Sequence, residues 1–186
     1  MQLFLICALL ALSTLAARSD TTKLEQALNQ PGVTVHVDRY SAAVLVSKDV
    51  WKLGDVTCVV AKSTDKGALS ADGLEIYAKQ TFRDMSFLET KVYVDDEDVP
   101  KLADQFAAML DAYDRSKRNP ADYSTSTFTT ASGLKLTTVH NGKNDPECTV
   151  ELNGLWTIDV PLKNQQSVQH LIDGLKVGEN WLSTHK

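Results

Sequence analysis

Two short stretches, SADGLEI at residues 70–76 and TASGLKL at residues 130–136, resemble each other. In each, small and polar residues precede a glycine, and alternating apolar residues follow it, which is typical of a turn that leads into a strand. Strand-like sequence and then an amphipathic helix follow both stretches, with the helices beginning near Val99 and near Asn164. The repetition predicts an internal duplication of a strands-then-helix unit. The alternative is coincidence, because a turn, a glycine and a strand often occur together.

The chain before the first of these helices reads as a short helix followed by strands. Helical spacing over residues 21–30 ends at Pro31-Gly32. Alternating or β-branched residues predict strands over residues 33–37, 43–46, 56–61, 74–78 and 87–94. From Val99, apolar residues at three- and four-residue spacing form the stripe of an amphipathic helix, which Asn119-Pro120 ends. The stripe consists of Val99, Leu102, Ala103, Phe106, Met109, Leu110 and Tyr113.

The second half repeats this plan. Strands are predicted over residues 123–130, 134–139, 148–152 and 155–160, with turns at residues 140–143 and 153–154. A second amphipathic helix begins near Asn164, and Gly174 and Gly178 favour its end or a bend before Trp181. The sequence therefore predicts an α+β protein in which antiparallel sheets are covered by two amphipathic helices. Residues 18–186 are predicted to form a single globular domain of two halves, about 18–118 and 119–186.

The first 17 residues predict a secretory signal peptide. The run from Leu3 to Leu12 is apolar and uncharged, and the small residues Ser13, Thr14, Ala16 and Ala17 follow it. The run is shorter than the roughly 20 apolar residues of a membrane-spanning helix. A buried N-terminal helix is the alternative, because no Lys or Arg precedes the run. Export predicts a secreted protein, extracellular or periplasmic, whose mature chain does not insert stably into a membrane.

Two of the three cysteines, Cys58 and Cys148, remain after the predicted cleavage. An exported chain meets oxidising conditions, so the pair predicts a disulfide that ties the two halves together. The alternative is two separate buried thiols, each packed as a small apolar residue. A metal site at these residues is not predicted, because neither has a second cysteine or a histidine at metal-ligand spacing.

Composition and charge limit the class of partner. The chain of 186 residues is 43% hydrophobic and 23% charged, with a net charge of −5, as in an ordinary globular protein. The order of its elements resembles that of the Whirly and Pur-alpha families, single-strand nucleic-acid binders with a duplicated sheet-plus-helix architecture. The likeness is one of element order only and transfers no site residues. We predict no nucleic-acid partner, because a phosphate binder needs a basic surface.

Motifs for catalysis, metals and nucleotides are sparse, so no catalytic residue, metal site or cofactor is predicted. The chain contains no G-x-S-x-G, G-x-G-x-x-G or P-loop sequence. His36 and Asp38 share one face of a predicted strand, as an ordinary surface pair or as a dyad. The acidic run 95–98 is a helix-start signal, with a calcium loop as the alternative. Four carboxylates lie on predicted strands, where any two could face each other as an acid–base pair: Glu75, Glu89, Glu151 and Asp159.

Three functions are compatible with these patterns. The favoured one is a non-catalytic exported binding or interaction module that uses an open sheet face or a groove between the halves, with an unknown protein or small ligand as partner. The others are an exported hydrolase whose site is assembled from distant residues, and a subunit of a cell-envelope or surface assembly. The Thr- and Ser-rich strand 123–130 is expected to be the solvent face of an edge strand rather than a polar groove. Trp51, Trp156 and Trp181 are expected to be core or lid residues.

Overall fold

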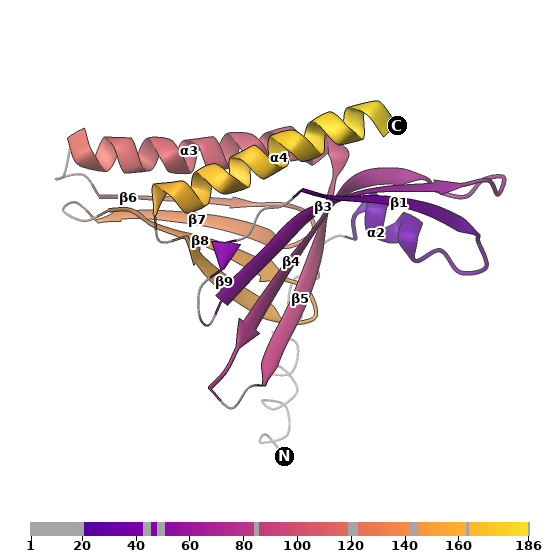
Figure 1. Ribbon diagram of the computed structural model, residues 1–186, viewed down its shortest axis with the longest axis horizontal. Coiled ribbons are helices and arrows are strands. Elements are labelled where there is room, and N and C mark those ends of the chain that lie inside the picture. Colours follow the sequence, from indigo (N-terminus) through magenta and orange to yellow (C-terminus); the bar gives the residue numbers. More distant parts are fainter. Residues whose placement is uncertain are drawn as a thin grey trace, which may run out of the picture.

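The computed structural model shows an α+β protein with two antiparallel sheets (Figure 1). It describes residues 21–42, 46–47, 51–83, 86–118, 123–141, 145–162 and 164–185. In sheet A, the order is β1 (Val35–Ala42), β3 (Trp51–Ser63), β4 (Ala71–Thr81) and β5 (Phe87–Asp95), and β2 (Val46–Ser47) pairs with β3 beyond the end of β1. In sheet B, the order is β6 (Tyr123–Thr129), β7 (Leu134–Asn141), β8 (Glu147–Asn153) and β9 (Thr157–Leu162). The predicted α+β class with antiparallel sheets is confirmed.

Helices connect and flank the sheets. Helix α2 (Lys23–Leu28) precedes sheet A, and the short 3-10 helix η1 (Asp96–Asp98) leads from β5 into α3 (Val99–Arg118). Helix α4 (Gln165–His185) follows sheet B and lies beside α3 (Figure 1). The structure thus follows the predicted order of elements closely. Residues 43–45 of one predicted strand and residues 1–17 of the predicted leader lie outside the described residues.

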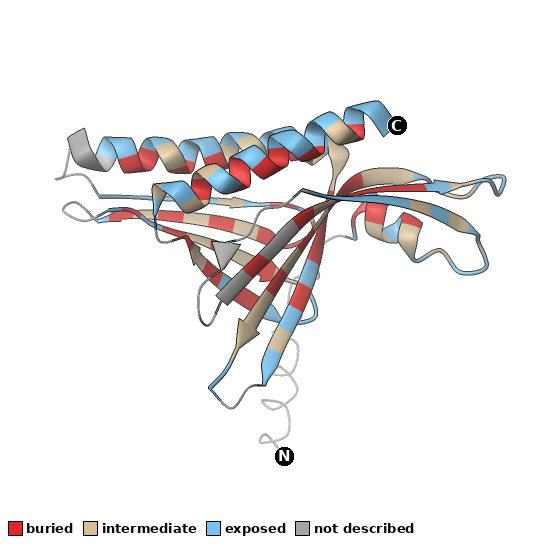
Figure 2. Ribbon diagram, viewed as in Figure 1, coloured by how far each residue is buried: buried red, intermediate tan, exposed pale blue. Residues whose placement is uncertain are grey.

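One hydrophobic core joins both sheets to both long helices (Figure 2). Its members include Leu102 and Phe106 on α3 and Leu171 and Leu175 on α4, each no more than 3% exposed. Each fully buried large side chain of this kind contributes about 1.5–3 kcal/mol. A second cluster, on the opposite face of sheet A, packs Leu24 and Ala27 of α2 against residues that include Tyr93.

The glycines of α4 do not end the helix, which continues to His185. Gly174 and Gly178 are both buried. A Cβ atom at Gly178 would lie 2.8 Å from the Sγ atom of Cys58 on β3. Gly178 therefore lets α4 approach sheet A closely, and this packing outweighs the weak helix propensity of glycine.

The predicted disulfide is not formed in the structure, where Cys58 and Cys148 are both free and buried. Cys58 belongs to sheet A and faces α4, whereas Cys148 belongs to sheet B and donates a hydrogen bond to Thr138, with 3.8 Å between Sγ and Oγ1. Burial raises the pKa of Cys58 to about 11 and also raises that of Cys148. Each thiol packs as a separate small side chain, the alternative that the sequence left open.

The two stretches that suggested a duplication occupy different positions in their sheets. Residues 70–76 enter β4, the third strand of sheet A along its pairing order, whereas residues 130–136 enter β7, the second strand of sheet B. Gly73 lies inside β4, but Gly133 lies in a turn and has a φ of 85°. The sequence of strands followed by a long helix does recur, and the duplication itself stays a prediction.

Candidate functional site

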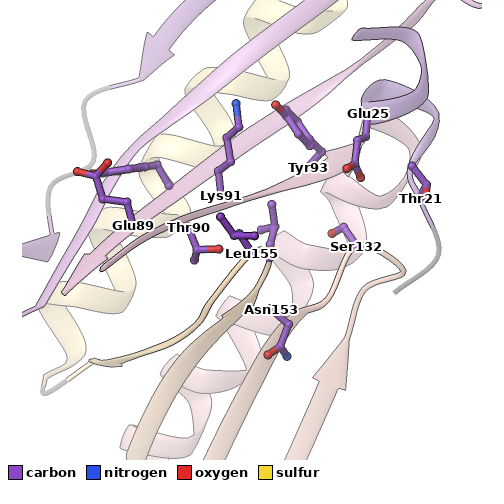
Figure 3. Close-up of a pocket in the computed structure, with 12 residues that line it drawn as sticks. Thr21, Glu25, Glu89, Thr90, Lys91, Tyr93, Ser132, Asn153 and Leu155 are labelled. Atoms are coloured by element: carbon purple, nitrogen blue, oxygen red, sulfur yellow. The ribbon is translucent and has the colours of Figure 1, made fainter. Parts of the chain in front are cut away.

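A cleft of about 760 Å³ opens between the two sheets (Figure 3). One wall is formed by β5 and by Tyr77 of β4. The rim is formed by Thr21 and Glu25, at the start of α2, and the opposite wall by two turns of sheet B. These turns, residues 130–133 and 153–156, contribute Ser132 and residues 153–155.

The cleft runs along the outer edge of β5. Five consecutive residues of this strand, 89–93, line it. Because successive side chains of a strand point to opposite faces, a cavity contacts all five only from the edge. β5 is the last strand of sheet A, so this edge pairs with no other strand among the described residues. The cleft is thus bounded by main-chain groups as well as by side chains.

Helix α2 is held over one end of the cleft by two caps. The hydroxyl of Thr22 accepts a hydrogen bond of 3.1 Å from the N–H of Glu25. The carboxylate of Asp95, at the end of β5, accepts hydrogen bonds of 3.0 and 2.9 Å from the N–H groups of Lys23 and Leu24. Acidic groups stabilise a helix N-terminus because they satisfy its free N–H groups. Asp95 thereby ties the rim residue Glu25 to the strand that forms the wall.

The two turns of sheet B brace each other. In the first, the hydroxyls of Thr130 and Ser132 are hydrogen-bonded at 2.9 Å, and both side chains are buried. The carbonyl of Gly133 accepts a hydrogen bond of 3.0 Å from the N–H of Asn153, which fixes the second turn to the first. The side chain of Asn153 in turn donates to Glu151 at 2.6 Å. This wall of the cleft is therefore held by local hydrogen bonds.

Gly154 brings the second turn against β5. A Cβ atom at this position would overlap the hydroxyl of Thr90 and would lie 2.6 Å from the carbonyl oxygen of Lys91. Only glycine fits such a close approach between backbones. The carbonyl of Lys91 therefore points out of sheet A toward the turn.

The hydroxyl of Thr90 is the unsatisfied polar group of the cleft. Thr90 is 4% exposed, and its Oγ1 has no hydrogen-bond partner in the structure. A buried hydroxyl without a partner costs about 1–3 kcal/mol. This oxygen is closed to solvent and lies against Gly154, so the second turn of sheet B covers it. Thr90 and Leu155 both line the cleft, and Leu155 is 85% exposed (Figure 3). Leu155 thus offers the cleft an apolar surface.

The charges on the sheet A wall are largely compensated by their neighbours. The hydroxyl of Tyr77 and the ammonium of Lys79, 3.2 Å away, lower the pKa of Glu89. Burial, together with Glu89, raises the pKa of Tyr77 to about 12. Interaction with the Tyr93 hydroxyl and with Glu75 raises the pKa of Lys91, although burial opposes this. Both Glu89 and Lys91 therefore stay ionised at neutral pH and have partners of their own.

Glu25 is different, because no residue of the described ranges forms an ion pair with it. Its side chain points from α2 into the cleft, on the side where Ser132 lies (Figure 3). The uncompensated charge of the cleft is therefore negative and lies at its α2 end. Hydroxyl groups occupy the middle of the cleft, and the apolar side chain of Leu155 lies beside them.

The candidate residues from the sequence lie elsewhere. His36 and Asp38 form a pair with 3.3 Å between Nε2 and Oδ1, and their side chains are 78% and 49% exposed on β1. The acidic run 95–98 forms the cap of α2 and the helix η1. Within the described ranges, no group of three or more His, Cys, Asp or Glu residues is placed to hold a metal ion.

The strand carboxylates are also separated. Glu75 and Glu89 each pair with a lysine on the outer face of sheet A. Glu151 lies opposite Asp159 across β8 and β9, and it forms an ion pair of 2.8 Å with Lys135. Of these four carboxylates, only Glu89 lines the cleft. The described cleft does not bring a histidine to its carboxylates.

Sequence reasoning missed most of the cleft. Leu155 and Trp156 were assigned to the last strand, but they lie in the turn before β9, and Trp156 is 52% exposed rather than part of the core. Trp181 is partly buried and stacks on Tyr40, with ring centroids 5.7 Å apart, and the side chain of Trp51 lies outside the description. The Asn153-Gly154 pair was the one sequence signal for the cleft, because it indicates a turn whose backbone can approach another segment closely.

No protein-family model, curated protein sequence or solved structure matches this chain. The likeness to the Whirly and Pur-alpha families therefore rests on element order alone. No helix among the described residues has the length and apolar character to cross a membrane.

Proposed function

We propose that this protein is an exported, non-catalytic binding protein and that the cleft between its sheets takes a small amphipathic ligand with a cationic or hydrogen-bond-donating group. The volume of about 760 Å³ lies within the range of small-molecule sites. Export is supported by the N-terminal sequence pattern alone. The single observation that carries the binding proposal is the lining of this cleft, which combines the Glu25 carboxylate, without an ion-pair partner among the described residues, with the exposed side chain of Leu155.

The arrangement of polar and apolar groups supports this ligand class. An amine placed at the α2 end gains an ionic hydrogen bond from Glu25, and such bonds are stronger than neutral ones. An apolar group then contacts Leu155, which is otherwise exposed to water. An anionic ligand is disfavoured, because Lys91 already has Glu75 as its partner at 3.5 Å.

A matched pair of probes tests the ligand class. The amine 2-phenylethylamine and the acid 3-phenylpropionate share an aromatic ring and a short chain but differ in charge. Each is titrated into ¹⁵N-labelled protein while the backbone amide signals are recorded. We expect the amine, at millimolar concentration, to shift signals of residues 89–93 and 153–155, and the acid to leave them unchanged. A stronger response to the acid would contradict the proposed ligand class.

Three variants locate the site. Glu25→Gln removes the uncompensated charge, and we expect it to weaken amine binding about tenfold, while Glu179→Gln, at an exposed position of α4, leaves binding unchanged. Thr21→Trp fills the rim of the cleft and should abolish binding. Its matched control is Thr34→Trp, at an exposed residue outside the cleft. If Thr21→Trp binds the amine as well as the wild type does, the cleft is not the binding site.

A further inference from the structure

The edge strands of the two sheets differ in how they are protected. An unpaired strand edge can pair with another chain, and proteins usually block this with charges, proline or a covering segment. β1 carries the charged residues Asp38 and Arg39. β5 carries Glu89 and Lys91, and the turn at Gly154 packs against it. β9 carries Asp159 and Pro161. β6, with the sequence YSTSTFT, has no charged residue and no proline.

β6 is also the most open of these strands. All of its residues are exposed except Phe128, which is partly buried, and Tyr123 is 75% exposed (Figure 2). The strand pairs along its whole length with β7 on one side, and among the described residues it has no strand on the other side. Its high content of threonine and its aromatic residues favour an extended strand that can accept a further partner. The edge is therefore long, preformed and unprotected.

An uncharged edge suits pairing with a second copy of itself. When two identical strands pair antiparallel across a two-fold axis, a residue at the axis faces its own counterpart. Any charge there would face the same charge, which destabilises a cross-strand pair. The chain has a net charge of −5, so two copies repel each other except where a contact surface is neutral. β6 provides such a surface.

Helix α3 lies beside β6. The helix and the strand border a shallow groove, into which Ser124 and Ser126 project from the strand. The helix lines this groove with the small side chains of Ala108 and Ala112 and with the longer ones of Gln105, Met109 and Arg115. The contact proposed below therefore uses the main-chain edge of β6 rather than this groove.

We propose that β6 is the contact through which two copies of this chain pair across a two-fold axis, joining their sheets B into one continuous antiparallel sheet. The contact consists of main-chain hydrogen bonds along β6 and of cross-strand Ser, Thr and Phe pairs. It leaves the cleft beside β5 open, because β5 and β6 belong to different sheets. The proposal is therefore independent of the ligand proposed above.

Sedimentation equilibrium of the purified protein measures the association. We expect a dimer whose dissociation constant falls as salt is added, because salt screens the repulsion between two chains of the same charge. Thr127→Lys places two ammonium groups close to the axis and should raise the dissociation constant at least tenfold. Its matched control is Thr157→Lys, at an exposed position of β9 on the other edge of sheet B. This control should leave the dissociation constant unchanged. A wild-type protein that stays monomeric up to about 1 mM overturns the proposal.

Variants with one added cysteine identify the contact. Cysteines at positions 124–127 are introduced one at a time into the mature chain, whose own Cys58 and Cys148 are buried, and the protein is oxidised gently. A residue at the two-fold axis faces its counterpart at a Cα separation of about 4.5–5.5 Å, which a disulfide can bridge. We expect one of the four positions to cross-link much faster than its neighbours. A dimer in which none of them cross-links, or in which Thr127→Lys has no effect, uses another surface and also overturns the proposal.

Discussion

Sheets A and B have the same number of strands along their main pairing path, but they differ in how many of their faces are packed against other elements. Sheet A is packed on both faces, by α4 at Cys58 and by α2 at Tyr93. Sheet B is packed on one face, and the other carries the ladder of Lys135, Glu151 and Asp159, in which Lys135 and Glu151 are partly buried and Asp159 is exposed. A shared order of elements thus does not give shared environments. Substitutions matched between the sheets measure this difference directly.

The largest loss of stability is expected from substitutions at the glycines of the two similar stretches, Gly73 and Gly133. A Cβ atom at Gly73 would overlap the carbonyl oxygen of Val94 and lie 3.1 Å from the Cα atom of Asp95. Both are backbone atoms of β5, so the β4–β5 pair must shift. We expect Gly73→Ala to lower the free energy of unfolding by about 3 kcal/mol, measured by urea denaturation.

Gly133→Ala is the matched substitution in sheet B. Gly133 has a φ of 85°, a region that alanine adopts at a cost of about 1–2 kcal/mol. Gly133→Asn should cost less than Gly133→Ala, because asparagine tolerates this region better. Equal losses for Gly73→Ala and Gly133→Ala would contradict the different roles that the structure gives to the two glycines.

The second comparison concerns the two thiols. Gly178→Ala places a methyl group against Cys58, which is fully buried, and should cost about 1–3 kcal/mol in thermal or urea unfolding. Cys58→Ala removes the obstructing sulfur, so the double variant should lose less stability than the sum of the two single variants, by about 1 kcal/mol.

Cys148→Ala serves as the control for this coupling. Cys148 contacts Thr138 in sheet B. Its replacement should therefore cost the same in the presence and in the absence of Gly178→Ala. Additive losses for the Cys58 and Gly178 pair would mean that α4 does not approach sheet A closely at this point.

Local patterns were sufficient to predict most elements of the fold. The stripe from Val99 to Tyr113 predicted α3, because helical periodicity is a property of neighbouring residues. The end of α4 was not predicted, since the close approach of Gly178 to Cys58 depends on a strand more than 100 residues earlier in the chain. Propensity alone favoured a break there, and tertiary packing overrode it.

The cleft was beyond local reasoning for the same reason. It is formed where the edge of β5 meets turns that follow it by tens of residues. Thr90 reads in the sequence as an ordinary strand residue, and its burial beneath Gly154 depends on a turn about 60 residues later in the chain. The acidic run 95–98 was correctly associated with a helix start, but Asp95 caps α2, which precedes it by about 70 residues. Sequence distance gives no access to such contacts.

The smallest expected loss of stability concerns the ion pairs on the surfaces of the two sheets. On sheet A, Glu75 is paired with Arg39 at 3.1 Å and with Lys91 at 3.5 Å. Burial would raise the pKa of Glu75, but the hydrogen bond from Arg39 and the charge of Lys91 outweigh it and lower the pKa. A carboxylate with a lowered folded-state pKa stabilises the protein at neutral pH, and this stability is lost as the pH falls through that pKa.

We therefore expect Glu75→Gln to reduce the free energy of unfolding by about 0.5–1 kcal/mol at neutral pH and to have almost no effect in acid, where Glu75 is protonated in both states. Glu151→Gln should cost less at neutral pH, although the hydrogen bond from Lys135 lowers the pKa of Glu151 as well. The Glu151→Gln substitution leaves only Lys135 without its carboxylate partner, whereas Glu75→Gln leaves both Arg39 and Lys91. Glu151→Gln also removes the repulsion between Glu151 and Asp159 on the neighbouring strand. Urea unfolding of both variants across the acidic range measures the difference, and a larger loss for Glu151→Gln would show that the ladder of sheet B is the stronger one.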